Sequence, residues 1–73
     1  MTIVQEGRLK GVFTGFKDQN TVFEFANGRK WRQKSYRYMY RYAYRPEAKV
    51  IEESGRYMLH VEGMNEAIEV RRA

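Results

Sequence analysis

The fold is decided by residues 21–33, which read TVFEFANGRKWRQ. An Asn-Gly pair between runs of alternating apolar and polar residues is the strongest short-range signal for a β-hairpin. Two registers are open to this hairpin. A two-residue turn at Asn27-Gly28 pairs Phe25 with Lys30, so an apolar side chain would lie beside a charged one. A three-residue loop over 26–28, with glycine in the left-handed region, moves the register by one residue.

The hydrophobic pattern selects the three-residue loop. In that register Phe23 pairs with Trp31 and Glu24 pairs with Lys30, so like lies beside like and opposite charges meet. Since a slip of one residue exchanges the two faces of a strand, this choice fixes which side chains face the core. We therefore expect a structural core made of Phe23, Phe25, Trp31, Leu59 and Val61, together with Leu9 or Phe13.

The rest of the chain also predicts strands. It has 73 residues, one proline and no cysteine, and its turn signals recur at short spacing between runs rich in Val, Ile, Phe and Tyr. We expect one domain over residues 1–73, an all-β, SH3-like or OB-like barrel of five to six antiparallel strands. The expected strands are 8–16, 21–25, 29–33, 36–44, 48–53, 56–62 and 67–71, with a short helical turn at 64–67 at most.

Three glycines punctuate the first expected strand. Gly7, Gly11 and Gly15 are four residues apart and alternate with apolar residues. Because glycines in a strand permit sharp coiling and close approach of the backbone, we interpret them as determinants of shape.

The charge is concentrated in one segment. The net charge is +5, and residues 29–45 carry seven bases and no acid, together with Trp31 and five of the six tyrosines. Within it, tyrosines occupy every second position from 36 to 44 and arginines alternate with them. A basic, aromatic segment favours an anionic partner or a protein interface.

One unbroken strand from 29 to 44 is excluded by burial energies. It would place Arg37 and Arg41 on the same face as Trp31, and two buried, unpaired guanidinium groups cost more than so small a core supplies. We therefore expect a bulge or break near residues 33–35 that exchanges the faces and turns some of the tyrosines inward.

The stretches FANGRKWRQ (25–33), YRYAYRP (40–46) and GRYMLHVEG (55–63) together resemble those of a group of uncharacterised small bacterial proteins, some of them carried on mobile gene cassettes. The resemblance covers roughly residues 12–71. It implies a small β-barrel fold, and it carries over no functional residue.

The sequence shows no catalytic or metal-binding pattern. It lacks phosphate-binding glycine loops, His60 is the only histidine, and Glu52 and Glu53 are adjacent and so point to opposite faces of a strand. We expect no enzyme activity, no metal and no cofactor. No apolar run is long enough to cross a bilayer and no signal sequence is evident, so we expect no membrane partner and a cytoplasmic location.

Two functions remain for the basic segment. The first is an interaction module, most simply a homo-oligomer or a contact with another protein, with Tyr38, Tyr40, Tyr42, Tyr44, Arg37, Arg41 and Arg45 at its surface. The second is a module for single-stranded nucleic acid, whose bases would stack on the tyrosines. On a regular strand the tyrosines and the arginines face opposite ways, which favours the first.

Overall fold

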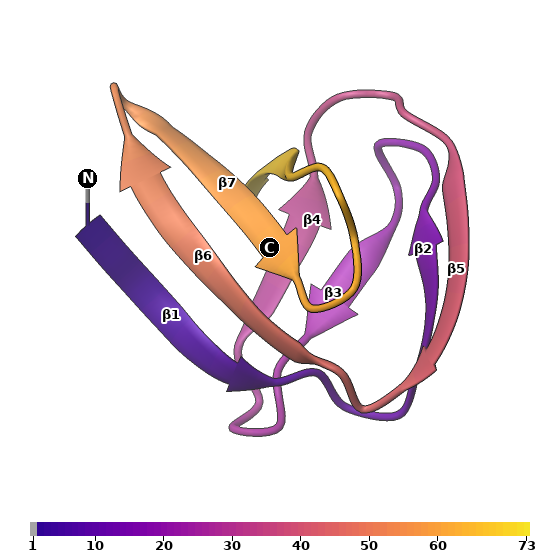
Figure 1. Ribbon diagram of the computed structural model, residues 1–73. Helices are drawn as coiled ribbons and strands as arrows, with labels where there is room; N and C mark the ends of the chain where they lie inside the picture. Colours follow the sequence, from indigo (N-terminus) through magenta and orange to yellow (C-terminus); the bar gives the residue numbers. More distant parts are fainter. Residues whose placement is uncertain (1) are drawn as a thin grey trace.

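The computed structural model describes residues 2–73, which form eight strands and no helix (Figure 1). The strands are β1 (Thr2–Arg8), β2 (Val12–Phe16), β3 (Val22–Glu24), β4 (Lys30–Gln33), β5 (Met39–Tyr44), β6 (Glu47–Glu53), β7 (Arg56–Val61) and β8 (Ile68–Arg72). Six of them make one antiparallel sheet in the order β1-β6-β7-β8-β4-β3, and β2 and β5 make a second, two-stranded sheet. The all-β prediction is confirmed. Residues 2–73 contain no helix long and apolar enough to cross a membrane.

The six-stranded sheet curls until its two edge strands touch. The contact is a single antiparallel bridge between Leu9 and Phe25, flanked by hydrogen bonds from the Lys10 amide to the Glu24 carbonyl and from the Ala26 amide to the Arg8 carbonyl. No ladder of strand pairs closes the barrel at this seam, and the chain has eight strands in two sheets. The small all-β fold is therefore confirmed, while the described residues form eight strands instead of the expected five to six and the barrel is not closed.

The hairpin that opened the sequence analysis has the register that its hydrophobic pattern selects. Phe23 pairs with Trp31, Glu24 with Lys30 and Val22 with Arg32. Trp31 is consequently 2% exposed, because its face of β4 looks into the curled sheet.

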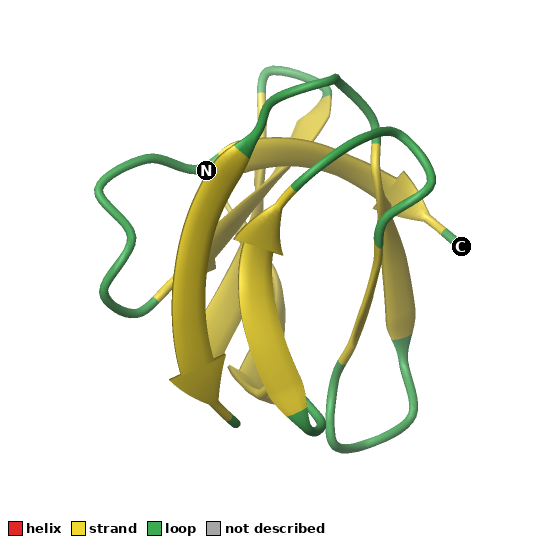
Figure 2. Cartoon of the chain, turned by 90° about the vertical axis from the view of Figure 1, so that its right-hand side faces the viewer, coloured by secondary structure: helices red, strands yellow, loops and turns green. Residues whose placement is uncertain are grey.

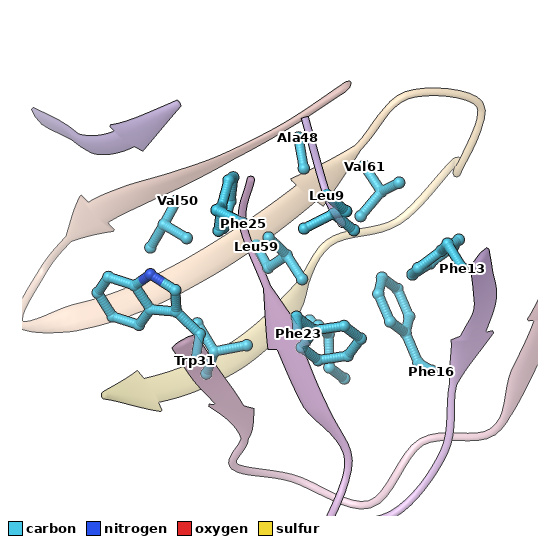
Figure 3. Close-up of a cluster of buried hydrophobic side chains, with 12 residues drawn as sticks. Leu9, Phe13, Phe16, Phe23, Phe25, Trp31, Ala48, Val50, Leu59 and Val61 are labelled. Atoms are coloured by element: carbon cyan, nitrogen blue, oxygen red, sulfur yellow. The ribbon is translucent and has the colours of Figure 1, made fainter. Parts of the chain in front are cut away.

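A single core fills the space between the two sheets (Figure 3). Its aromatic centre comes from β2 and β3, where the rings of Phe13, Phe16 and Phe23 pack with centroids 5.9 to 6.3 Å apart. The five residues expected in the core, Phe23, Phe25, Trp31, Leu59 and Val61, all lie in this cluster, and both Leu9 and Phe13 join them.

The boundaries of several elements differ from those expected from the sequence. The expected strand 8–16 is interrupted between Arg8 and Val12, where the chain leaves the large sheet for the small one. Residues 2–7, for which the sequence pattern predicts no strand, belong to β1 and pair with β6. The expected helical turn at 64–67 does not form, since these residues lie in an irregular connection between β7 and β8.

The two-stranded sheet depends on Gly15. Phe13 and Phe16, three residues apart on β2, lie opposite Ala43 and Met39, four residues apart on β5, so the register shifts between them. Gly15 takes up the mismatch with a φ of +106°. A Cβ at this position would lie 1.9 Å from the carbonyl oxygen of Met39. Only glycine allows this backbone approach.

Gln33 ends β4 and fixes the path of the chain toward β5. Its side chain is fully buried, and Oε1 accepts a hydrogen bond of 2.9 Å from the amide of Lys17. Nε2 lies within hydrogen-bonding distance of three carbonyl oxygens, those of Lys17 at 2.9 Å, Ser35 at 2.8 Å and Arg37 at 3.3 Å. The break expected near residues 33–35 is therefore present, and one amide side chain holds it.

We predict that Gly15→Ala destabilises the protein by more than about 2 kcal/mol, because the new methyl group meets a backbone oxygen that cannot move alone. Gly11→Ala is the matched control. Gly11 also has a positive φ, of +73°, but no neighbouring atom lies within 4 Å of the position that a Cβ would take. Gly11→Ala should therefore lower the free energy of unfolding by only about 1 kcal/mol. Urea unfolding of the two variants measures the difference, and equal costs would contradict the close approach.

We also predict that Gln33→Leu costs about 2–4 kcal/mol, since the substitution leaves the amide of Lys17 and several carbonyl groups buried without partners. Gln19→Leu, at an exposed turn position, should change stability by less than about 0.5 kcal/mol. The comparison uses urea unfolding followed by the fluorescence of Trp31, the only tryptophan. A neutral Gln33→Leu would mean that this side chain does not hold the break.

Candidate interaction surface

Five tyrosines lie on the outside of the protein along β5 and the segment before it. Tyr36, Tyr38, Tyr40, Tyr42 and Tyr44 are between 62% and 70% exposed. We call these five side chains the tyrosine stripe. Figure 2 looks onto the side of the molecule where β5 and β2 lie (compare Figure 1). A row of five exposed aromatic rings needs a physical explanation, because single exposed hydrophobic residues are common on protein surfaces and contiguous groups of them are not.

The stripe faces outward because smaller side chains occupy the inner face of β5. Met39 and Ala43 are half-buried and pack against the core. On the outer face Tyr44 lies opposite Val12, which is itself 53% exposed, and Tyr40 lies opposite Gly15. The expectation that some tyrosines of this segment turn inward was therefore wrong. The break after β4 leads β5 into a separate sheet, where Met39 and Ala43 already fill the available space.

Arg37 and Arg41 lie at the surface, where their charged groups stay in contact with solvent. Arg37 donates to the carboxylate of Glu66 and forms an ion pair with it. The guanidinium of Arg41 lies beside Gly63, since a Cβ there would be 2.9 Å from one of its nitrogens. The connection between β7 and β8 thus contacts the side chains of Arg37 and Arg41 while both stay exposed. The cost of burying two guanidinium groups therefore does not arise.

Two acidic residues near the end of the chain, Glu66 and Glu69, partly neutralise the charge of the basic segment 29–45. Besides the pair of Arg37, Lys34 Nζ lies 3.4 Å from a carboxylate oxygen of Glu69. Within residues 2–73 no ion pair engages Arg41 or Arg45, and Arg45 occupies the tight β5–β6 turn with a φ of +49°. Arg41 and Arg45, which make no ion pair, are therefore neighbours in sequence of the uncharged tyrosines Tyr40, Tyr42 and Tyr44.

The outer edge of β5 is open. β5 pairs with β2 along one edge, and no strand in the described part of the chain pairs with its other edge. An edge of this kind presents unpaired N–H and C=O groups and is a template for another strand. Three of the five tyrosines of the stripe, Tyr40, Tyr42 and Tyr44, lie on this open strand.

Arg72 is a surface residue that the sequence analysis did not single out. β8 places it opposite Trp31, and its guanidinium carbon lies 5.0 Å from the Trp31 ring centroid and 5.5 Å from that of Tyr57. No local pattern signals this contact, because it depends on the pairing of two strands about forty residues apart in the chain.

Two surface hollows lie away from the stripe. One, of about 460 Å³, is lined by Asn27, Gly28, Arg29, Lys30, Trp31, Arg72 and Ala73. The other, of about 360 Å³, contains His60 with Glu6, Glu47, Lys49 and Glu62. Among residues 2–73 no group of three or more His, Cys, Asp or Glu side chains is placed to hold a metal ion.

Comparisons with known proteins found no match. No family model matches it, no curated protein matches it, and no solved structure matches it. The resemblance to small bacterial β-barrel proteins therefore stays a prediction, and the function has to be argued from the surface itself.

Proposed function

We propose that this protein is a non-enzymatic interaction module that self-associates through β5. The proposal rests on one observation: a strand with an open edge carries a row of tyrosines that are each more than 60% exposed. Tyrosine supplies large, rigid contact area at low entropic cost and is enriched in interface cores. A core as small as this one also gains from the area that association buries.

A second copy is the occupant that the edge fits best. Two identical open edges can pair antiparallel about a two-fold axis, and each then satisfies the unpaired backbone groups of the other. The stripe itself carries no formal charge, so two stripes meet without the repulsion that the net charge of +5 would otherwise cause.

Like charges select the register of such a pair. Directly opposite residues in an antiparallel pair share a face, so the tyrosine stripes become continuous only when tyrosine faces tyrosine. A register centred on Arg41 places that arginine opposite its own copy, and one centred on Ala43 places Arg41 opposite Arg45. Registers centred on Tyr40 and on Tyr42 avoid both contacts. The second pairs residues 40–44 of β5 with each other, with Tyr40 facing Tyr44, whereas the first pairs only residues 39–41 of the strand. We therefore propose a four-stranded sheet β2-β5-β5-β2 with Tyr42 on the axis.

Cysteine cross-linking tests this register, and the natural chain contains no cysteine to interfere. Tyr42→Cys should form a disulfide-linked dimer under mild oxidation, because the two Cβ atoms would lie about 4.5–5.5 Å apart. Tyr40→Cys alone should not, since its own copy would be about 13 Å away along the strand. A mixture of Tyr40→Cys and Tyr44→Cys proteins should cross-link to each other.

The oligomeric state gives an independent test. Sedimentation at tens of micromolar should show a dimer that Tyr42→Lys converts to a monomer. Val22→Lys is the matched control, because Val22 is also an exposed apolar residue on an edge strand and the change adds the same charge. A monomeric natural protein, or equal cross-linking of Tyr42→Cys and Ser54→Cys, would refute self-association through β5.

Single-stranded nucleic acid is the second candidate, and one observation favours it. Within residues 2–73 five bases of segment 29–45 make no ion pair, namely Arg29, Lys30, Arg32, Arg41 and Arg45. Such binding would release counterions, so the slope of log affinity against log salt should be about −2 when three phosphates are contacted. Stacking on Tyr40 or Tyr42 would contribute about 1–3 kcal/mol per base.

Fluorescence anisotropy with random single strands of about 20 nucleotides, at two salt concentrations, separates the candidates. Replacing Tyr40 and Tyr42 with leucine should abolish stacking but keep much of an apolar dimer contact. Binding that disappears at physiological salt and does not respond to these replacements would be the behaviour of any basic protein, and would leave self-association as the function.

A further inference from the structure

The hollow beside the Asn27-Gly28 loop, where β4 begins and β8 ends, has the chemistry of an anion site. Three of the residues that line it are cationic, Arg29, Lys30 and Arg72, and no acidic side chain lines it. The nearest acid along the hairpin is Glu24, which lies opposite Lys30 but forms its ion pair with Lys10, at 3.8 Å. Arg29 and Arg72 therefore line this hollow without a counter-charge from a side chain, whereas the side chain of Lys30, which follows the pairing of Glu24, lies on the opposite face of β4 from Trp31.

Arg72 is already held in a fixed position there. Its guanidinium packs against the rings of Trp31 and Tyr57, which are themselves 5.2 Å apart. Stacking of this kind covers the flat faces of a guanidinium and leaves its N–H groups at the edge. Within the described chain these N–H groups donate no hydrogen bond and Arg72 joins no ion pair. An ordered guanidinium with free donors matches the two-oxygen edge of a carboxylate or phosphate.

The hairpin loop supplies the second wall. Asn27 Oδ1 accepts a hydrogen bond of 3.0 Å from the amide of Arg29, and the Gly28 amide donates to the Phe25 carbonyl at 2.9 Å. These bonds fix the loop backbone that carries Arg29 and Lys30. The long side chain of Arg29 on this fixed loop can therefore reach an anion that Arg72 holds.

We infer that this hollow binds a phosphate group, either as inorganic phosphate or as the phosphate of a small monoester. A tetrahedral dianion has enough oxygens to meet Arg72 through two of them and Arg29 through a third, which a carboxylate does not. The site is separate from the tyrosine stripe on β5, so it does not depend on self-association.

Trp31 reports on this site directly, because it is the only tryptophan and Arg72 lies against its ring. Titration with phosphate at constant ionic strength should change the Trp31 fluorescence saturably, with a Kd of about 1 mM. Sodium chloride should give no saturable change and acetate a weaker response. Comparing inorganic phosphate with adenosine monophosphate identifies the source, since tighter binding of the nucleotide indicates a monoester.

Two charge-matched double variants decide the matter. Arg29→Gln with Lys30→Gln keeps the stacked arginine and should weaken phosphate binding about tenfold or more. Lys17→Gln with Arg56→Gln removes the same charge at exposed positions away from the hollow and should leave the Kd within about twofold. Equal weakening by both variants would overturn the site, because the effect would then be one of net charge.

Arg72→Lys tests the guanidinium itself. It keeps the charge but loses the planar pair of donors, so binding should weaken while circular dichroism stays that of the folded protein. The titration is made with the 73-residue chain and with a chain extended by Gly-Ser after Ala73, since an α-carboxylate there would compete with phosphate. Binding by either form supports the site, and no saturable response from both forms up to about 10 mM phosphate would overturn it.

Discussion

The buried amide of Gln33 is the interaction on which the arrangement of the two sheets depends. It contacts backbone groups of Lys17, Ser35 and Arg37, and so ties the end of β2, the end of β4 and the approach to β5 together. A polar side chain is stable at this depth because both ends of its amide have partners. Without this contact the backbone groups that it satisfies at the junction of β2, β4 and β5 would lose their buried partner.

A second constraint on the surface is electrostatic, and it comes from two acidic residues in the C-terminal part of the chain. Glu66 and Glu69 lie far from the basic segment in sequence, but the fold brings them to Arg37 and Lys34. These pairs are partly exposed and contribute little to stability individually. Their effect is on the surface, since they neutralise two of the bases in the segment that leads into β5.

The sequence predicts the hairpin well because its information is local. The pairing of Phe23 with Trp31 follows from one loop and one alternating pattern, and Leu59 and Val61 follow from the same alternation. The fate of the tyrosines does not follow, because it depends on which residues of β2 lie opposite β5. Gly15 is visible in the sequence, but its contact with the Met39 carbonyl belongs to the fold. The stack of Arg72 on Trp31 is hidden for the same reason.

The separation of the tyrosine stripe from the core has a consequence for the evolution of this protein. The side chains at positions 40, 42 and 44 point away from the packed interior, while Met39 and Ala43 on the same strand hold it in place. Exposed substitutions that touch no core group usually change stability by less than about 0.5 kcal/mol. The outer face of β5 can therefore acquire new residues, and with them new binding preferences, on a scaffold whose folding is set elsewhere.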